Sequence, residues 1–545
     1  MNTLLQQPVR DSPRTTVFDI PLLVDLIAQH LINLDLCRCS LVSRQFRDAF
    51  QHRLYTCISI EHETTHVKFF CKESVIAFSR HRSNVREVST PLGRSIIHLV
   101  KEAESQRTLR QAQQSTRVLF RNLTVFRYLS EHALIRPADL KVYSASILLL
   151  LETSPALQVL HLSCFADKPG RLLLRLAKII RRRGSRLKHF CIEGPQRLID
   201  DTVFYTLLWS CAAVEVLHMG FGPKTRPPTA FAKSLPIFKT LAREARCNSG
   251  PGTHSAQSEA TDMVESSQDT DRIEFAWKEL GPGVWLNDPE LEMVRELLQK
   301  CPFLERMVFP KLIEQDVITH LAPVVVNSMR QLRHLDLTHF TGQPQGSCTL
   351  IQSCNNLISL TLGKLQFNPT LLVDAVVLGH GHSLQSLNIE RSKMLTSQQL
   401  NLILSNCPRL LSLHAQSFPR TGSSPVLDTK DLARVPEEPG WGCKDLETLH
   451  LCYNVETTIG IPEVLWRQIG QLSKLTDLRI RRHTLRQVPP SQEKESVRQA
   501  LSSWKVLSNL KQLELAGMDA FVDEAVVDEV RRQWSQLEWV RRNID

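Results

Sequence analysis

The 545-residue sequence lacks the features that would mark a membrane protein, a secreted protein or a common class of enzyme. It has no apolar run of about 18 residues or more, so we expect no membrane-spanning helix. Its start, MNTLLQQPVRDSPRTT, lacks the apolar core of a secretion signal, and residues 1–14 are predicted to be disordered. The phrases G-x-S-x-G and H-E-x-x-H, the P-loop and a G-x-G-x-x-G after a strand are all absent. We therefore predict no catalytic residue and no enzymatic activity.

What the sequence does contain is one phrase, L-x-x-L-x-L, repeated many times. From Leu304 onward, successive copies begin 25 to 36 residues apart. Side chains alternate between the two faces of a strand, so the fourth and sixth positions point to one face and the fifth to the other. A single strand with few inward leucines cannot offset its own ordering entropy, whereas stacked copies share one continuous core. The copies begin at Leu157, Leu187, Val214, Leu304, Leu332, Leu357, Leu384, Leu410, Leu446, Leu475, Leu510 and, weakly, Leu537.

This phrase at this spacing resembles the leucine-rich repeat. The resemblance implies an α/β fold, a curved solenoid with parallel strands on its concave side and helices outside. The asparagine or cysteine that the family often carries eight residues beyond the first leucine is present only as Asn454, so an irregular solenoid is expected. We place the solenoid at residues 156–545, preceded by a linker and degenerate first repeats at residues 63–155. Residues 246–272 contain no aromatic side chain and are predicted to be a disordered insertion.

The cysteines support a repeat rather than a disulfide framework or a zinc site. There are 14 of them, and five lie three residues before the start of a phrase. A cysteine that keeps this phase is expected to be a small buried apolar residue. Together with the absent secretion signal, core cysteines favour a reducing compartment, the cytoplasm or the nucleus. The five are Cys211, Cys301, Cys354, Cys407 and Cys443.

The charge balance is mild for a chain of this size. Lys and Arg number 66 and Asp and Glu 56, which gives a formal net charge of +10. The densest basic stretch, residues 168–188, interleaves Lys and Arg with Leu and Ile at helical spacing. It is either an anion or nucleic-acid patch or the solvated face of an amphipathic helix that ends at Gly184. Because aromatic residues are not interleaved, we favour the solvated face and expect no nucleic-acid partner.

Residues 15–62 differ from the repeats and predict a small helical module. Pro21 suits the start of an apolar-striped helix, Asp35 is expected to cap a second, and Ser43 to start a third. Three short helices bury little apolar surface, so a partner surface is expected. A helical cap over the first repeat is the alternative.

This module resembles an F-box. The likeness rests on Ile20-Pro21 in place of the family's Leu-Pro pair, on Ile27 and Leu31, and on Leu41-Val42 followed by Ser43-Arg44. Phe46 stands where many members carry Trp, and no acidic residue follows Pro21. With the repeats, the chain resembles F-box/leucine-rich-repeat proteins, which are substrate receptors of cullin-type ubiquitin ligases. The resemblance implies that the module binds a Skp-type adaptor, and through it a cullin. The residues that it implies for the adaptor contact or its scaffold are Pro21, Leu22, Ile27, Leu41, Val42 and Phe46.

On the concave side, the side chains between the last two apolar positions of each phrase are expected to contact a protein target. Their mixture of donors and acceptors is typical of protein-recognition surfaces. Four histidines among them raise the possibility of a metal site, but we expect scattered, solvated histidines, no metal and no other cofactor. A leucine-rich-repeat scaffold without a ubiquitin role is the alternative function. The predicted target-binding residues are His161, His218, Asp336, Asn388, His414, His450, Arg479 and Arg481.

Overall fold

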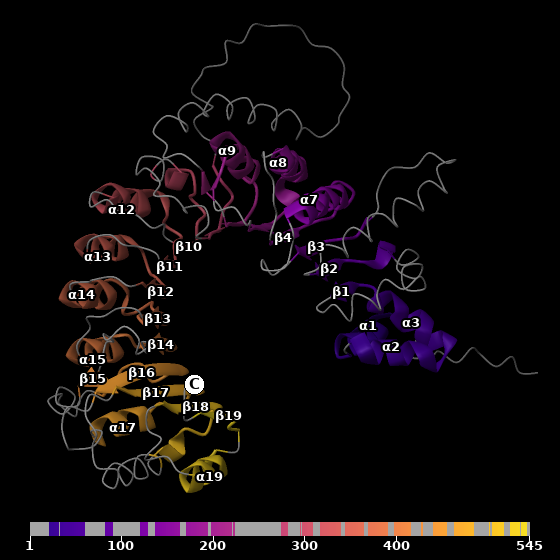
Figure 1. Ribbon diagram of the computed structural model, residues 1–545. Coiled ribbons are helices and arrows are strands. Elements are labelled where there is room, and N and C mark those ends of the chain that lie inside the picture. The colour runs from indigo at the N-terminus through magenta and orange to yellow at the C-terminus, as the bar shows by residue number, and fades with distance from the viewer. Residues whose placement is uncertain are drawn as a thin grey trace, which may run out of the picture. The chain divides into compact units, whose positions relative to one another are not determined.

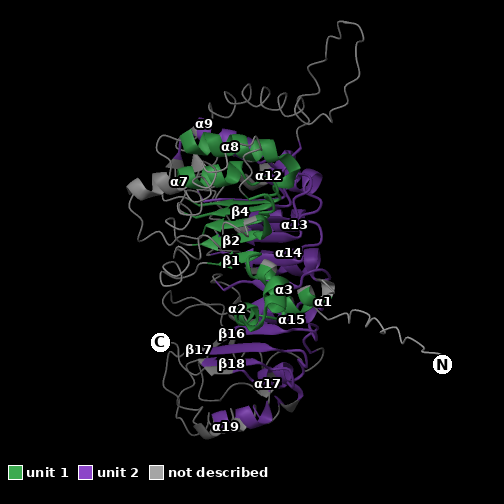
Figure 2. Cartoon of the chain, turned by 90° about the vertical axis from the view of Figure 1, so that its right-hand side faces the viewer, with its two compact units in different colours: residues 1–196 green, residues 197–545 purple. Residues whose placement is uncertain are grey.

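The computed structural model describes residues 21–31, 33–59, 82–90, 120–128, 137–163, 171–193, 198–220, 222–223, 274–281, 295, 297–308, 317–338, 344–363, 369–390, 397–415, 427–428, 440–454, 463–483, 501, 504–516, 524–534 and 536–541. The chain divides into two compact units, residues 1–196 (unit 1) and 197–545 (unit 2) (Figure 2). The segments predicted to be disordered, residues 1–14 and 246–272, lie outside the described residues. Within these ranges, no helix combines the length and the hydropathy needed to cross a membrane.

Unit 1 begins with three helices, α1 (Pro21–Gln29), α2 (Asn33–Val42) and α3 (Arg44–Leu54). Ser43 is the N-cap of α3, as predicted, because its Oγ accepts a hydrogen bond of 3.1 Å from the backbone N–H of Phe46. The prediction for Asp35 is wrong. Since α2 already begins at Asn33, Asp35 lies in its first turn rather than at its cap. The helices share a small core of Val24, Ala28, Leu36 and Phe50.

The strands of unit 1 form a parallel ladder in chain order. They are β1 (Cys57–Ser59), β2 (Glu87–Thr90), β3 (Val125–Tyr128), β4 (Val159–Leu162) and β5 (His189–Ile192). Strands β2 and β3 come from the segment in which degenerate first repeats were predicted, and each pairs in register with its neighbours. The short 3-10 turns are η2 (Arg82–Asn84) and η4 (Gly184–Arg186).

Two helices of unit 1, α7 (Pro137–Glu152) and α8 (Arg171–Arg183), accompany this ladder (Figure 1). The α8 helix buries one apolar stripe, as its amphipathic sequence predicts. It ends where Gly184 adopts a left-handed φ of 53°, which glycine tolerates because it has no Cβ. The buried residues of α8 are Leu173, Leu176, Ala177, Ile179 and Ile180.

Unit 2 contains a longer parallel ladder, again in chain order. Its strands are β7 (Val216–Met219), β9 (Glu279–Leu280), β10 (Arg306–Val308), β11 (His334–Leu337), β12 (Ser359–Leu362), β13 (Ser386–Asn388), β14 (Ser412–His414), β16 (Thr448–Asn454), β17 (Asp477–His483), β18 (Gln512–Ala516) and β19 (Trp539–Arg541). A short strand, β15 (Leu427–Asp428), pairs with the far end of β16. Strands β6 (Leu198–Ile199) and β8 (Gly222–Pro223) form a separate pair.

The helices of unit 2 follow the strands one by one and lie along one side of the ladder (Figure 1). The predicted α/β architecture of parallel strands with helices on one side is thus confirmed for the described residues. The helical elements are α9 (Asp201–Ser210), α12 (Val317–Ser328), α13 (Pro344–Ser353), α14 (Pro369–His380), α15 (Ser397–Asn406), α17 (Glu463–Gly470), the 3-10 turn η8 (Trp504–Val506) and α19 (Glu524–Gln533).

The register of the ladder aligns the same phrase position in every strand. Leu335 pairs with Leu360, Leu360 with Leu387, and Leu387 with Leu413. All these side chains are buried, at 2% exposure or less, whereas the residues between them are half exposed. The phrase therefore buries its leucines against the helices and turns the intervening residues to the opposite face.

The phase-keeping cysteines are buried at the helix side of the ladder, as predicted. Cys211, Cys301, Cys354, Cys407 and Cys443 are all at most 4% exposed. Burial raises the pKa of Cys354, Cys407 and Cys443 to about 12, because the thiolate loses its hydration. Every cysteine whose side chain the structure describes is a free thiol.

A buried histidine joins two consecutive repeats. His380, at the end of α14, is 2% exposed. Its Nδ1 accepts the backbone N–H of Leu357 at 3.3 Å, and its Nε2 lies 2.8 Å from the carbonyl oxygen of Ile351. Both contacts suit a neutral ring that carries its proton on Nε2. Burial lowers the pKa of His380 below its usual 6.5 and outweighs the opposing hydrogen bond to Ile351.

We predict that His380→Gln reduces the pH sensitivity of folding. Because the folded-state pKa is depressed, His380 stabilises the fold fully above about pH 6.5 and progressively less as the pH falls below that value. Melting temperatures at about pH 7.5 and pH 5.5 should differ less in the variant than in the wild type. At the higher pH the variant should be less stable by about 1–3 kcal/mol, because the N–H of Leu357 loses its acceptor. Equal acid sensitivity in the wild type, His380→Gln and the exposed control His382→Gln would contradict this role.

Candidate functional site

The face of the unit 2 sheet opposite the helices carries a continuous line of side chains, here named the polar row. The register places each member beside the next, because every one occupies the position between the last two apolar residues of its phrase. Neighbouring strands lie about 4.8 Å apart, so adjacent side chains in the row are within reach of one another. The polar row consists of Asp336, Thr361, Asn388, His414, His450, Arg479 and Glu514.

The centre of the polar row is a connected network rather than a set of separate solvated histidines. The Nδ1 atoms of His414 and His450 lie 2.9 Å apart, and their rings meet edge to face with centroids 4.3 Å apart. His450 Nε2 lies 3.1 Å from Asp477 Oδ2, and His414 Nε2 lies 2.9 Å from Ser412 Oγ. Glu390 Oε1 is 3.7 Å from His414 Nδ1. The expectation of scattered, solvated histidines is wrong here, since His450 is only 5% exposed.

The surroundings of His414 and Asp477 determine whether each carries a charge. Burial, together with the neighbouring His450, lowers the pKa of His414 to about 4, so its ring is neutral at neutral pH. Burial alone would raise the pKa of Asp477, but hydrogen bonds from His450 and Arg479 outweigh burial and lower it. Arg479 donates to both carboxylate oxygens of Asp477, at 3.1 and 3.0 Å, and also to Gln512 at 3.2 Å.

The two predicted target-binding arginines differ in their surroundings. Arg479 is half buried and held by Asp477. Arg481 is 8% exposed, and its guanidinium lies 3.9 Å from the carboxylate of Glu514, which is itself 5% exposed. Arg481, predicted to bind the target, is therefore buried beside Glu514. Glu514 lies on β18, two residues before Ala516, the register partner of Arg481, and its carboxylate holds the guanidinium against the sheet.

The remaining predicted residues of unit 2 are held by local contacts. Asp336 accepts the backbone N–H of Thr338 at 2.7 Å, and Asn388 accepts that of Glu390 at 3.1 Å. His218, on β7, lies 3.1 Å from a carboxylate oxygen of Glu279 on β9. All three predicted side chains remain partly exposed, so they are available to a ligand while being fixed in direction.

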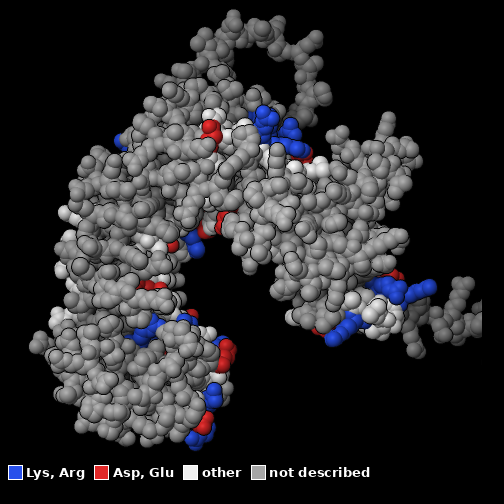
Figure 3. Space-filling model, viewed as in Figure 1, with Lys and Arg blue, Asp and Glu red and all other residues white. Residues whose placement is uncertain are grey.

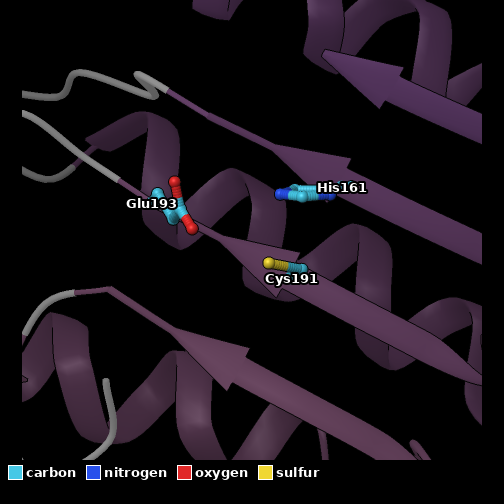
Figure 4. A group of neighbouring side chains, drawn as sticks. All are labelled: His161, Cys191 and Glu193. Carbon is cyan, nitrogen blue, oxygen red and sulfur yellow. The ribbon is translucent and has the colours of Figure 1, made fainter. Parts of the chain in front are cut away.

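Unit 1 presents a second cluster, formed by His161, Cys191 and Glu193 (Figure 4). His161 and Cys191 are register partners on β4 and β5, and Glu193 directly follows β5. One ligand atom from each lies within 4.8 Å of the others. Burial and the nearby Glu193 raise the pKa of the Cys191 thiol to about 12, so the sulfur is protonated unless a metal replaces the proton. Sequence reasoning selected His161 but missed Glu193, whose position beyond the phrase gave no signal.

The N-terminal helices expose large apolar side chains. Ile27 is 41% exposed, Leu41 76% and Val42 69%, and Leu23 and Leu26 on α1 are exposed as well. In the space-filling view, the uncharged residues of this segment are flanked by Lys and Arg side chains (Figure 3).

The other predicted adaptor-binding residues are Phe46, Pro21 and Leu22. Phe46 is half buried and packs against the helical core, with its ring centroid 6.0 Å from that of Phe50. The side chains of Pro21 and Leu22 lie outside the described residues.

The basic helix α8 forms a cluster of Lys and Arg side chains on the surface of unit 1 (Figure 3). Two of its arginines are engaged within the protein. Arg175 makes a two-pronged bond to Glu152, at 2.7 and 2.6 Å, and lowers the pKa of that carboxyl. Arg183 donates to the carbonyl oxygen of Leu151. These bonds tie α8 to α7.

No sequence profile of a known protein family matches the chain, and no curated protein matches it in sequence. A chain in the crystal structure of the TLR13–ssRNA13 complex superposes with a TM-score of 0.34 and 13% identity, over 91% of this chain and 56% of that one. A chain in the crystal structure of the Rad7–Elc1 complex of yeast gives a TM-score of 0.37 and 12% identity, over 88% of this chain and 90% of that one. The chain thus spans little more than half of the TLR13 chain. Superpositions this weak support no conclusion about function.

Thiol chemistry tests the surroundings of Cys191. We predict that alkylation of the native protein labels the exposed Cys37 well before Cys191, because only the thiolate reacts and the pKa of Cys191 is raised. The buried Cys211 and Cys301 should react only after denaturation. Mass spectrometry of the labelled peptides over time measures the order. Labelling of Cys191 as fast as Cys37 would contradict the described environment.

Proposed function

We propose that the chain is the substrate-recognition subunit of an SCF-type ubiquitin ligase. The N-terminal helices would dock a Skp-type adaptor and through it a cullin, and the polar row would bind a protein target. The observation that carries this proposal is the exposed apolar surface of α1 and α2. It adds to the F-box resemblance of the same residues.

The exposed surface is large relative to the segment that bears it. Among the described side chains of the three helices, the fully buried core consists of Val24, Ala28, Leu36 and Phe50. Leu41 and Val42 are adjacent at the end of α2 and are both more than two-thirds exposed, at 76% and 69%. Contiguous exposed apolar side chains with charged neighbours are typical of protein-binding surfaces. A partner that covers them would supply the burial that the small core does not.

On the repeat side, the proposal is supported by the rigidity and chemical variety of the polar row. Its side chains stand on paired strands and include a carboxylate, a hydroxyl, an amide, imidazoles and a guanidinium. Groups held in this way lose little conformational entropy when a partner binds. Holding a target and an adaptor on one chain raises the effective concentration of ubiquitin-loaded enzyme near the target. The chain itself would break no bond.

The alternative function is a leucine-rich-repeat interaction scaffold with no ubiquitin role. One observation favours it, because β1 follows α3 directly and pairs with β2, as expected for a helical cap over the first strand. In that case the exposed apolar side chains of α2 would bind no Skp-type adaptor.

Adaptor binding separates the two functions. We predict that the purified chain binds a Skp-type adaptor and that Leu41→Asp/Val42→Asp weakens this binding at least tenfold, or about 1.4 kcal/mol. The reason is that carboxylates would be buried in an apolar interface. Both residues are exposed, so the variant should melt at the wild-type temperature. The matched control is Leu378→Asp, which places the same charge at an 82% exposed leucine of α14.

Surface plasmon resonance with immobilised adaptor gives the affinities. No binding by a folded wild-type chain would favour the scaffold. Equal binding by the double variant would contradict the proposed contact residues.

Target capture tests the polar row. We predict that Thr361→Arg, the second position of the row, removes proteins that co-purify with the wild-type chain while adaptor binding is kept. The bulky cation would occupy space between Asp336 and Asn388, its register neighbours. Gln352→Arg on α13 is the control, since it adds the same charge on the helix side at an exposed position. Quantitative mass spectrometry of the captured proteins compares the three, and identical sets would exclude the row as the target surface.

A further inference from the structure

We propose that Glu390, His414 and His450 form a binding site for a divalent transition-metal ion of the zinc type. The site belongs to unit 2 and is independent of the proposed ligase function. The three residues come from adjacent strand positions, with Glu390 just after β13, His414 at the end of β14 and His450 within β16. One ligand atom from each lies within 4.8 Å of the others.

The distances suit one shared ion. Zinc binds imidazole nitrogen and carboxylate oxygen at about 2.0–2.2 Å, which places tetrahedral ligand atoms about 3.3 Å apart. His414 Nδ1 lies 3.7 Å from Glu390 Oε1 and 2.9 Å from His450 Nδ1. An ion therefore requires the two rings to separate by a few tenths of an ångström and Glu390 to approach by a similar amount. Rotation about side-chain torsions is sufficient for such shifts.

The second ring nitrogen of each histidine already has the partner that a metal ligand needs. His450 Nε2 faces Asp477 Oδ2 at 3.1 Å, and Arg479 fixes that carboxylate from its other side. A histidine that donates its Nε2–H to a carboxylate presents the Nδ1 lone pair to the ion and becomes a stronger ligand. His414 Nε2 faces Ser412 Oγ at 2.9 Å, and the hydroxyl can accept its proton.

The proton arrangement follows from these contacts. With both rings neutral and no metal, His450 donates Nε2–H to Asp477, and His414 donates Nδ1–H to His450 Nδ1. Ion binding moves the proton of His414 from Nδ1 to Nε2, where Ser412 accepts it. Both Nδ1 lone pairs then face the ion, and no net proton is released.

The backbone holds the ligands in place before an ion arrives. The N–H of Ile389 bonds to the carbonyl of His414 at 2.7 Å, and the N–H of Ala415 bonds to that of His450 at 2.8 Å. Access is from solvent, because the side chains of His414 and Glu390 are 28% and 32% exposed. Three protein ligands leave a fourth position for water or for a side chain of a bound protein.

The cluster of His161, Cys191 and Glu193 is the weaker of the two candidates. One of its ligands is a thiol, which must lose a proton to bind an ion, whereas a neutral imidazole binds without such a loss. Its carboxylate, Glu193, is exposed. The sulfur nevertheless provides a spectroscopic distinction between the two sites.

The test uses the full-length chain without an affinity tag, stripped with a chelator and titrated with Zn²⁺ and, separately, with Co²⁺. We expect one Zn²⁺ per chain and a higher melting temperature with Zn²⁺, but neither effect with Mg²⁺. Bound Co²⁺ should show the visible bands of a four-coordinate ion without a thiolate charge-transfer band. His414→Ala and Glu390→Gln should each weaken Zn²⁺ binding at least tenfold. Asp477→Asn, which alters a positioning residue, should weaken it about 10–100-fold.

Two matched controls should keep the wild-type affinity, His189→Ala, an exposed histidine of β5, and Cys191→Ser in the other cluster. The melting temperature of each variant without metal shows that it is folded. The proposal is overturned if the stripped wild type binds no Zn²⁺ with one-to-one stoichiometry. It is also overturned if His414→Ala binds as tightly as the wild type, or if the Co²⁺ form shows a thiolate band that Cys191→Ser removes.

Discussion

Consecutive strands of unit 2 are joined through the backbone in a constant register, and the rest of the structure depends on this constraint. The residue before each strand repeats the same bond, as when the N–H of Arg333 binds the carbonyl of Glu305 and that of Ile358 binds Arg333. The carbonyl oxygen of one repeat thus accepts a hydrogen bond from the next repeat at the residue just before that repeat's strand begins. A shift by one residue would turn every leucine of that strand to the wrong face. The shared core of buried leucines makes such a shift too costly, so packing and register enforce each other.

The same register creates the chemistry of the opposite face. Asn388, His414, His450 and Arg479 are neighbours only because each occupies the same place in its phrase. Strand spacing brings His414 into contact with His450, and Asp477 links His450 to Arg479, so hydrogen bonds replace hydration there. Arg479 and His450 share the single carboxylate of Asp477, so the charge of the guanidinium is balanced locally. A row of residues that look independent in the sequence is one electrostatic unit in the fold.

The sequence predicts most of the architecture because each repeat is a local signal that recurs. The leucine phrase, the phase-keeping cysteines and the Ser43 cap all depend on neighbours within a few residues. What it does not predict depends mainly on contacts between different repeats. Arg481 is held against the sheet by Glu514. His380 is buried where it bonds the N–H of Leu357 and the carbonyl of Ile351 in the preceding repeat. Asp35 was assigned to a cap on composition, yet α2 begins two residues earlier.

The repeats of unit 2 and the three N-terminal helices differ in which side chains they expose. Along the repeats, apolar side chains are buried by stacking, and polar side chains on the opposite face are hydrogen-bonded to one another. The three N-terminal helices have too few residues to enclose their own leucines, and Leu41 and Val42 remain in water. Burying such side chains contributes about 1.5–3 kcal/mol each. A partner on α2 therefore gains energy mainly from apolar burial, whereas a partner on the polar row must match groups that already have hydrogen bonds. The apolar surface of α2 favours tight binding of one partner with a complementary shape. The polar row favours selectivity among many possible partners.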